Sequence, residues 1–136
     1  MMLRAICMSL TFAIIGCASA QPDVTGSGSQ VAIRQIQTRE YDTLDKQMTM
    51  RSTVSTLQDL GFVIDNADVD LGTVTATRHR KYTMRMTVTV REKDGKRVAV
   101  RANARIEEKA IDDPRTYQDF FTALDKAMFL TLQKVD

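Results

Sequence analysis

The longest regular pattern of the chain lies on either side of a polar turn at residues 93–95. Before the turn, apolar residues take the even positions from Tyr82 to Val90, while threonine and arginine take the odd positions. After the turn, apolar residues again take the even positions, from Val98 to Ile106. Because strand side chains alternate between two faces, this pattern predicts an antiparallel hairpin with one buried and one solvent-facing side.

The turn between these strands allows a prediction of their register. A loop of two residues, Asp94 and Gly95, would set even-numbered apolar residues opposite odd-numbered ones and mix the two faces. A three-residue loop that begins at Lys93 keeps the faces apart and pairs Val90 with Val98. We therefore expect a type I turn followed by a bulge, with Gly95 in the left-handed conformation.

Two segments have the periodicity of amphipathic helices. In the first, Met50, Val54 and Leu57 recur on one helical face, and Gly61 predicts the end of the helix. Either Thr43 or Asp45 can cap its start. The second helix begins near Pro114, and a wide apolar stripe predicts burial along its whole length. The residues of this stripe are Tyr117, Phe120, Phe121, Leu124, Met128, Leu132 and Val135.

Three shorter segments complete the expected fold. We expect strands at residues 31–38, 62–65 and 73–77. The order is then β-α-β-β-β-β-α, an α+β class in which an antiparallel sheet of four to five strands carries both helices on one face. Residues 31–136 have the size of one domain, and the opposite face of its sheet stays open.

The start of the chain is typical of an exported protein. A single basic residue, Arg4, precedes an apolar run over residues 6–15. That run is shorter than the roughly 20 residues of a membrane span but suits an export signal. The sequence Ile-Ile-Gly-Cys at residues 14–17 resembles the lipobox of bacterial lipoproteins. The resemblance implies a signal peptide at residues 1–16 and an acylated, for example palmitoylated, Cys17 that anchors the protein in the membrane.

A second processing site overlaps the first. The sequence Ala-Ser-Ala at residues 18–20 fits ordinary signal cleavage, which would remove Cys17 and release a soluble protein. On the lipoprotein interpretation, residues 17–30 comprise the acylated cysteine and a small, polar, flexible tether with a reach on the order of 20 Å. The neutral Ala18 then implies the outer membrane, with the domain facing the periplasm. Cys7 leaves with the signal, so the mature chain has no disulfide.

Charge and chemistry exclude several functions. The chain has 19 basic and 17 acidic residues, and removal of Arg4 with the signal leaves 18 and 17, a net charge of about +1. This small charge and the export signal argue against a nucleic-acid partner. His79 is the only histidine, Ser52 and Ser55 lie inside a predicted helix, and residues 65–70 lack the glycine and distal glutamate of a calcium loop. We therefore expect no enzyme activity, metal or cofactor.

Basic residues accumulate on the expected open face and in the turn before it. The candidate interaction residues are Arg78, Arg80, Lys81, Arg85, Arg91, Arg97, Arg101 and Arg105. They have two interpretations: a solvated strand face that resists aggregation, or a docking surface for an acidic partner. Such a partner would be lipid phosphate, a polysaccharide or another envelope protein, because guanidinium groups bind phosphate and carboxylate bidentately.

Local sequences also resemble a known group of proteins. Residues 37–41, 57–62 and 70–72, together with Ala76, resemble short uncharacterised bacterial lipoproteins over roughly residues 35–80. This resemblance implies no biochemical activity. The order of the elements is similar to that of the helix-grip domains of the lipoprotein subunit in outer-membrane barrel assembly, a similarity at the level of the fold alone.

These features lead to two functional hypotheses. The first is a non-enzymatic, lipid-anchored binding or accessory module of the bacterial envelope. The alternative is a small-ligand-binding protein or enzyme with a cavity between the sheet and the C-terminal helix, which Met84, Met86 and Met128 could line.

Overall fold

A computed structural model describes residues 24–133 of the chain. The expected signal peptide, Cys17 and Val135 lie outside these residues. The elements, in chain order, are α1 (Val24–Ile36), β1 (Thr38–Tyr41), α2 (Lys46–Asp59), β2 (Val63–Asp68), β3 (Thr73–His79), β4 (Thr83–Lys93), β5 (Arg97–Ile106), β6 (Lys109–Ala110) and α3 (Pro114–Gln133). No helix among the described residues is both long enough and apolar enough to cross a membrane.

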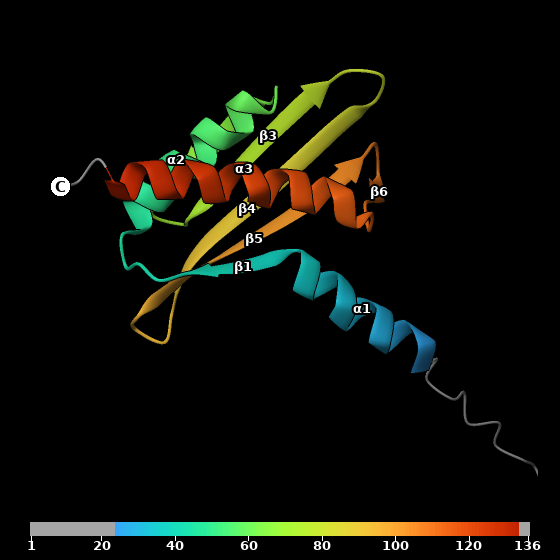
Figure 1. Cartoon of the computed structure of the whole chain (residues 1–136). Helices are drawn as coiled ribbons and strands as arrows, with labels where there is room; N and C mark the ends of the chain where they lie inside the picture. Colours follow the sequence, from blue (N-terminus) through green and yellow to red (C-terminus); the bar gives the residue numbers. More distant parts are fainter. Residues whose placement is uncertain (1–23, 134–136) are drawn as a thin grey trace, which may run out of the picture.

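The strands form one antiparallel sheet in the order β1-β5-β4-β3-β2, and the short β6 also pairs with β5, farther along the edge that β1 occupies. Figure 1 shows α2 and α3 lying across the same face of this sheet. The expected α+β class, with an antiparallel sheet, is thereby confirmed. A further helix, α1, precedes β1 and contacts both β1 and α3.

Helix α1 replaces most of a predicted strand. The expected strand at residues 31–38 is wrong, because the chain is helical up to Ile36 and β1 begins only at Thr38. Ile33 and Ile36 are three positions apart and therefore lie on one side of a helix, and Ile36 packs against the core. The helix also includes residues 24–30, which the sequence pattern places in the tether.

Helix α2 begins and ends where the sequence predicted. The Asp45 carboxylate caps its start by accepting a hydrogen bond of 2.8 Å from a backbone N–H of the first turn. At its end, the Phe62 N–H donates to the Leu57 carbonyl at 2.9 Å, and the Gly61 N–H donates to the Gln58 carbonyl at 3.0 Å. This pair of bonds is the Schellman motif.

The hairpin of β4 and β5 has the predicted faces but not the predicted register. Val90 lies opposite Val100, not opposite Val98, so the expected register is wrong by two residues. Because the error is an even number, the even positions of both strands still share one face. The residues buried on that face are Met86, Val88, Val90, Val98, Val100, Ala102 and Ala104.

The turn explains the register. Asp94 and Gly95 adopt φ values of 51° and 67°, and both central residues of a type I′ turn have positive φ. The Lys96 N–H closes this turn by donating to the Lys93 carbonyl at 3.3 Å. The ladder then resumes with Lys93 opposite Arg97. The turn therefore has two central residues, Asp94 and Gly95. Lys96 is an extra residue on β5's side, and it keeps even-numbered positions opposite even-numbered positions.

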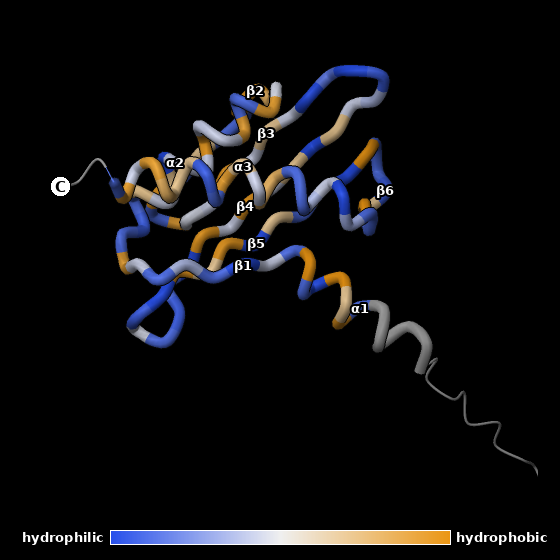
Figure 2. The backbone as a smooth tube through the Cα atoms, viewed as in Figure 1, coloured by the Kyte–Doolittle hydropathy of each residue, from blue (hydrophilic) through white to orange (hydrophobic). Residues whose placement is uncertain are grey.

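The core lies between the sheet and the helices α2 and α3. Figure 2 shows apolar stretches of β4 and β5 beneath α3, whereas the turns at both ends of β4 are hydrophilic. The predicted stripe of α3 is buried from Tyr117 to Met128. Leu132 was expected to continue it but is 50% exposed, as are Phe129 and Leu130 to a similar degree, because the last turns of α3 extend beyond the packed core.

Candidate functional site

The uncovered face of the sheet is a continuous polar surface. Odd-numbered residues of β4 and β5 point away from the helices. The odd-numbered residues of β3 lie opposite odd-numbered residues of β4 and therefore share this face. Threonine suits these positions because β-branched side chains favour the pleated strand. We call this surface the open face and define it by Thr73, Thr75, Thr87, Thr89, Asn103, Arg85, Arg91, Arg101 and Arg105.

Two arginines of the open face lie directly opposite each other. Arg85 on β4 pairs with Arg105 on β5, and both side chains are exposed. Like charges in directly opposed positions destabilise a sheet. Within residues 24–133, neither of them makes an ion pair with a carboxylate, although Arg105 donates to the Glu108 carbonyl oxygen at 2.9 Å. The arrangement therefore leaves two exposed arginines side by side on adjacent strands.

The other arginines form a second group on the same face. Arg101 is four residues from Arg105 along β5, which corresponds to about 13 Å. Arg91 pairs with Ala99, two residues from Arg101, so these two arginines lie diagonally across adjacent strands. Both are exposed, and neither has a carboxylate partner among the described residues. The open face thus carries two basic groups separated by a row of threonine and asparagine.

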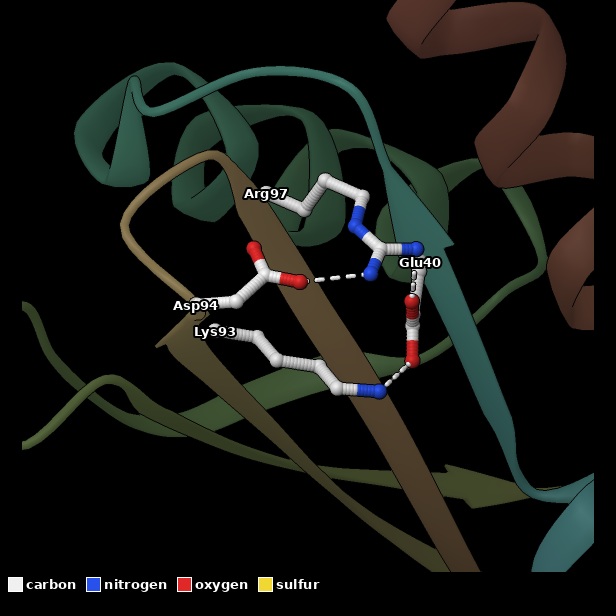
Figure 3. A network of polar contacts seen from close by, with 4 residues as sticks. All are labelled: Glu40, Lys93, Asp94 and Arg97. Atoms are coloured by element: carbon white, nitrogen blue, oxygen red, sulfur yellow. Dashed lines mark hydrogen bonds and ion pairs between the residues drawn. The ribbon is translucent and has the colours of Figure 1, made fainter.

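Arg97, also a candidate from the sequence, is held in an ion-pair network at the tip of the hairpin. Figure 3 shows Glu40 of β1 between Lys93 and Arg97, with Asp94 on the other side of Arg97. The hydrogen bond from Lys93 holds the pKa of Glu40 below its ordinary value. The hydrogen bond with Asp94 raises the pKa of Arg97. Arg97 is therefore neutralised by its neighbours, unlike the other arginines of this face.

Arg78, near the end of β3, and Lys81, in the turn after it, have other neighbours than the arginines of the open face. Arg78 pairs with Met84 in the register of even positions, so its side chain lies on the helix-covered side. Its guanidinium donates to the Leu60 carbonyl at 3.2 Å and lies 4.7 Å from the Phe62 ring centroid. Lys81 instead places its ammonium 5.5 Å from the ring of an adjacent tyrosine. Even-numbered positions in this part of the sheet face the helices, and Arg78 has an even number. The sequence alone could therefore have placed its side chain on the covered side.

A groove lies beside Arg78, between the end of α2 and the middle of α3. It has a volume of about 540 Å³, and its lining includes Met84 and Met86, two of the three methionines named for a cavity next to the C-terminal helix. Met128, the third residue of that hypothesis, is not part of the lining. We call this hollow the α2–α3 groove and define it by Phe62, Arg78, Arg80, Met84, Asp119 and Lys126.

The aspartates of residues 65–70 make local contacts. The Asp65 carboxylate accepts a hydrogen bond of 2.5 Å from the Thr77 hydroxyl, and Asp68 accepts one of 2.9 Å from the Leu71 N–H. In the part of the chain that the structure describes, no group of three or more His, Cys, Asp and Glu side chains could hold a metal ion. His79 lies 3.2 Å from a threonine hydroxyl at the exposed end of β3.

A comparison with models of known protein families gives no match, and a comparison with curated protein sequences gives none either. The resemblance to short bacterial lipoproteins therefore stays a prediction, and so does the similarity to helix-grip domains. The function has to be argued from the surfaces of the molecule itself.

Proposed function

We propose that the protein is a non-enzymatic, lipid-anchored module of the bacterial envelope whose open face binds an acidic partner. The observation that supports this most directly is the opposed pair of Arg85 and Arg105, which lacks a carboxylate partner within residues 24–133. An anion between the two guanidinium groups would replace their repulsion by two charge-assisted hydrogen bonds.

The second basic group extends the proposed binding surface. Arg91 and Arg101 lie about 13 Å or more along the sheet from the opposed pair, measured between backbone positions. A partner with several negative charges along its surface would contact both groups at once. The threonine hydroxyls and the Asn103 amide between them can donate further hydrogen bonds. Because the arginines are exposed, the attraction is expected to weaken as salt screens it over about 8–10 Å.

The proposed anchor determines where this partner would be met. Acylation of Cys17 would hold the domain at a membrane, in our proposal the outer membrane on its periplasmic side. Helix α1 has 13 residues, a length of about 20 Å. The domain would therefore remain within a few tens of ångströms of the bilayer, among lipid phosphates, polysaccharides and other envelope proteins.

A charge-reversal experiment in intact cells tests the proposal. Wild-type protein is crosslinked and purified, and the captured molecules are identified by mass spectrometry. We expect an acidic partner that is lost in the double variant Arg85→Glu, Arg101→Glu. The matched control is Arg51→Glu, Arg115→Glu, which reverses two exposed charges on helices and should retain the partner. Equal capture by both variants would show that the open face is not the binding surface.

A further inference from the structure

The α2–α3 groove has the size and position of a small-molecule site. Its volume of about 540 Å³ falls within the range of roughly 300–1,000 Å³ that is common for ligand pockets. The Schellman end of α2 forms one wall, α3 forms the other, and β3 and β4 form the floor. The groove lies on the helix-covered side of the sheet, so it is independent of the open face.

Three cationic side chains line this groove. Arg78 and Arg80 come from the end of β3 and the turn after it, and Lys126 comes from α3 on the opposite wall. The Arg78 guanidinium is fixed by the Leu60 carbonyl and the Phe62 ring, which use only part of its five N–H donors. Within residues 24–133 none of the three cations forms an ion pair.

Local geometry brings the two arginines together. A terminal guanidinium nitrogen of Arg80 lies 3.1 Å from the position that a Cβ atom on Gly61 would occupy, so the absence of a side chain at Gly61 leaves room for it. Burial is the largest cause that lowers the pKa of Arg78, and the positive charge of Arg80 lowers it further, whereas the negative charge of Asp119 acts in the opposite direction. The two guanidinium groups are thus close enough to repel each other, and a bound anion would relieve that repulsion.

The rest of the lining indicates what kind of anion fits. The partly exposed Met84 supplies an apolar surface above the buried Phe62 and Phe120, whereas Thr116 and Thr122 add hydroxyl groups. The groove also contains two carboxylates, Asp59 and Asp119, against its three cations. The balance of three positive and two negative charges leaves +1, which one negative charge on a ligand would neutralise.

We propose that the α2–α3 groove binds a small amphiphilic anion. Its carboxylate or phosphate head contacts the guanidinium groups of Arg78 and Arg80 and the ammonium of Lys126. Its short apolar part lies along Met84, which is partly exposed. The guanidinium fork and the ammonium are complementary to such a head group, and the floor is complementary to a hydrocarbon chain.

Titrations followed by ¹H–¹⁵N NMR test this site on the chain carrying Cys17→Ala, which lacks the acylation site, after its signal peptide has been cleaved. The probes are hexanoate, hexyl phosphate, hexanol and inorganic phosphate. We expect saturable shifts of the amides of Leu60, Phe62 and Ala123 with hexanoate or hexyl phosphate, and comparison of the two identifies the preferred head group. Hexanol and inorganic phosphate should bind at least about tenfold more weakly, because hexanol lacks the anionic head and inorganic phosphate lacks the apolar chain.

Paired variants separate the groove from the open face. Arg78 also caps α2, so its removal could unfold the end of the helix and is avoided. The variant Arg80→Gln, Lys126→Gln should weaken binding of the amphiphilic anion at least about tenfold. The control Arg85→Gln, Arg101→Gln removes the same charge from the open face and should leave binding unchanged. Equal weakening by both pairs, shifts outside the groove, or equal affinity for hexanol would overturn the proposal.

Discussion

At the scale of single residues, the hydroxyl of Tyr117 joins three separate segments. It accepts hydrogen bonds from the Gln37 side-chain amide at 3.1 Å and from the Ala104 N–H at 3.2 Å, and it donates to the Ile111 carbonyl at 2.6 Å. Ala104 belongs to the stretch of β5 between its pairings with β1 and β6. The side chain of Tyr117 thus satisfies a backbone group of β5 that neither neighbouring strand reaches.

Removal of this hydroxyl should destabilise the fold. Tyr117 is 1% exposed, so Tyr117→Phe would leave buried donors and an acceptor without a partner. We expect the free energy of unfolding to fall by about 1–3 kcal/mol in urea titrations. The control Tyr82→Phe changes a side chain that is 56% exposed and should have little effect. Equal stability of the two variants would contradict the role assigned to Tyr117.

Tyr41 predicts how stability depends on alkaline pH. Burial is the first cause that raises the pKa of its hydroxyl above 10.0, and its hydrogen bond of 2.8 Å to Asp125 is the second. The unfolded chain therefore releases this proton near pH 10, whereas the folded chain retains it to higher pH. Stability from this group is full below pH 10 and is lost as the pH rises beyond it. In urea titrations, the free energy of unfolding should fall less at alkaline pH for Tyr41→Phe than for wild type. An identical fall in both proteins would exclude Tyr41 as a cause.

At the scale of elements, the β2–β3 turn is attached to two neighbours. The Val90 N–H of β4 donates to the Gly72 carbonyl at 2.7 Å, and the Lys46 ammonium of α2 donates to the Asp70 carbonyl at 3.0 Å. Gly72 has a φ of 69°, and a Cβ atom there would lie 2.2 Å from the Val90 carbonyl oxygen. Position 72 therefore requires glycine for two reasons, backbone conformation and contact with β4.

A pair of identical substitutions separates these two reasons. Gly95 has a φ of 67°, and a Cβ atom added there would have no other atom within 4 Å. We therefore expect Gly95→Ala to lower the free energy of unfolding by about 1–2 kcal/mol through the backbone conformation alone. Gly72→Ala meets a similar φ and the clash with β4, which adds about 1–3 kcal/mol. Thermal or urea unfolding measures both. If Gly72→Ala were no more harmful than Gly95→Ala, the contact with β4 would not matter.

The elements that the sequence predicted well depend on short-range chemistry. The cap at Asp45 and the stop at Gly61 each involve a few consecutive residues, and both are confirmed. The strand predicted at residues 31–38 failed, because the helical alternative is selected by packing of Ile36 on a distant core. The hairpin register failed by two residues, since a one-residue bulge at Lys96 changes the pairing without changing the pattern of faces.

At the scale of the whole molecule, the fold divides the basic residues into separate environments. Arg85, Arg91, Arg101 and Arg105 stay on the open face, whereas Arg78 and Arg80 line the α2–α3 groove, Arg97 is neutralised and Lys81 lies against a ring. The sequence presented them as one group because it shows proximity along the chain but not pairing across it. This division is what makes two independent binding proposals possible.

The proposed anchor is tested on the same scale. Cys17→Ala removes the acylation site and leaves signal cleavage to the Ala-Ser-Ala sequence at residues 18–20. The variant should then move from the membrane fraction to the soluble fraction, because each buried CH₂ of an acyl chain contributes about 0.8 kcal/mol to membrane binding. Wild-type protein should remain with the membrane and carry the added mass of its acyl chains on a chain that starts at Cys17. A mature wild-type chain that starts at Gln21 would refute the anchor and favour cleavage after Ala20.

The sequence by itself determined the class of the fold, the faces of the strands, the caps of α2 and the stripe of α3 up to Met128, because periodicity and capping are local properties of the chain. Tertiary structure alone decided the pairing of Arg85 with Arg105, the place of Arg78 beside Phe62, and the groove between α2 and α3. These features join residues that are distant in sequence, and only register and helix packing bring them together.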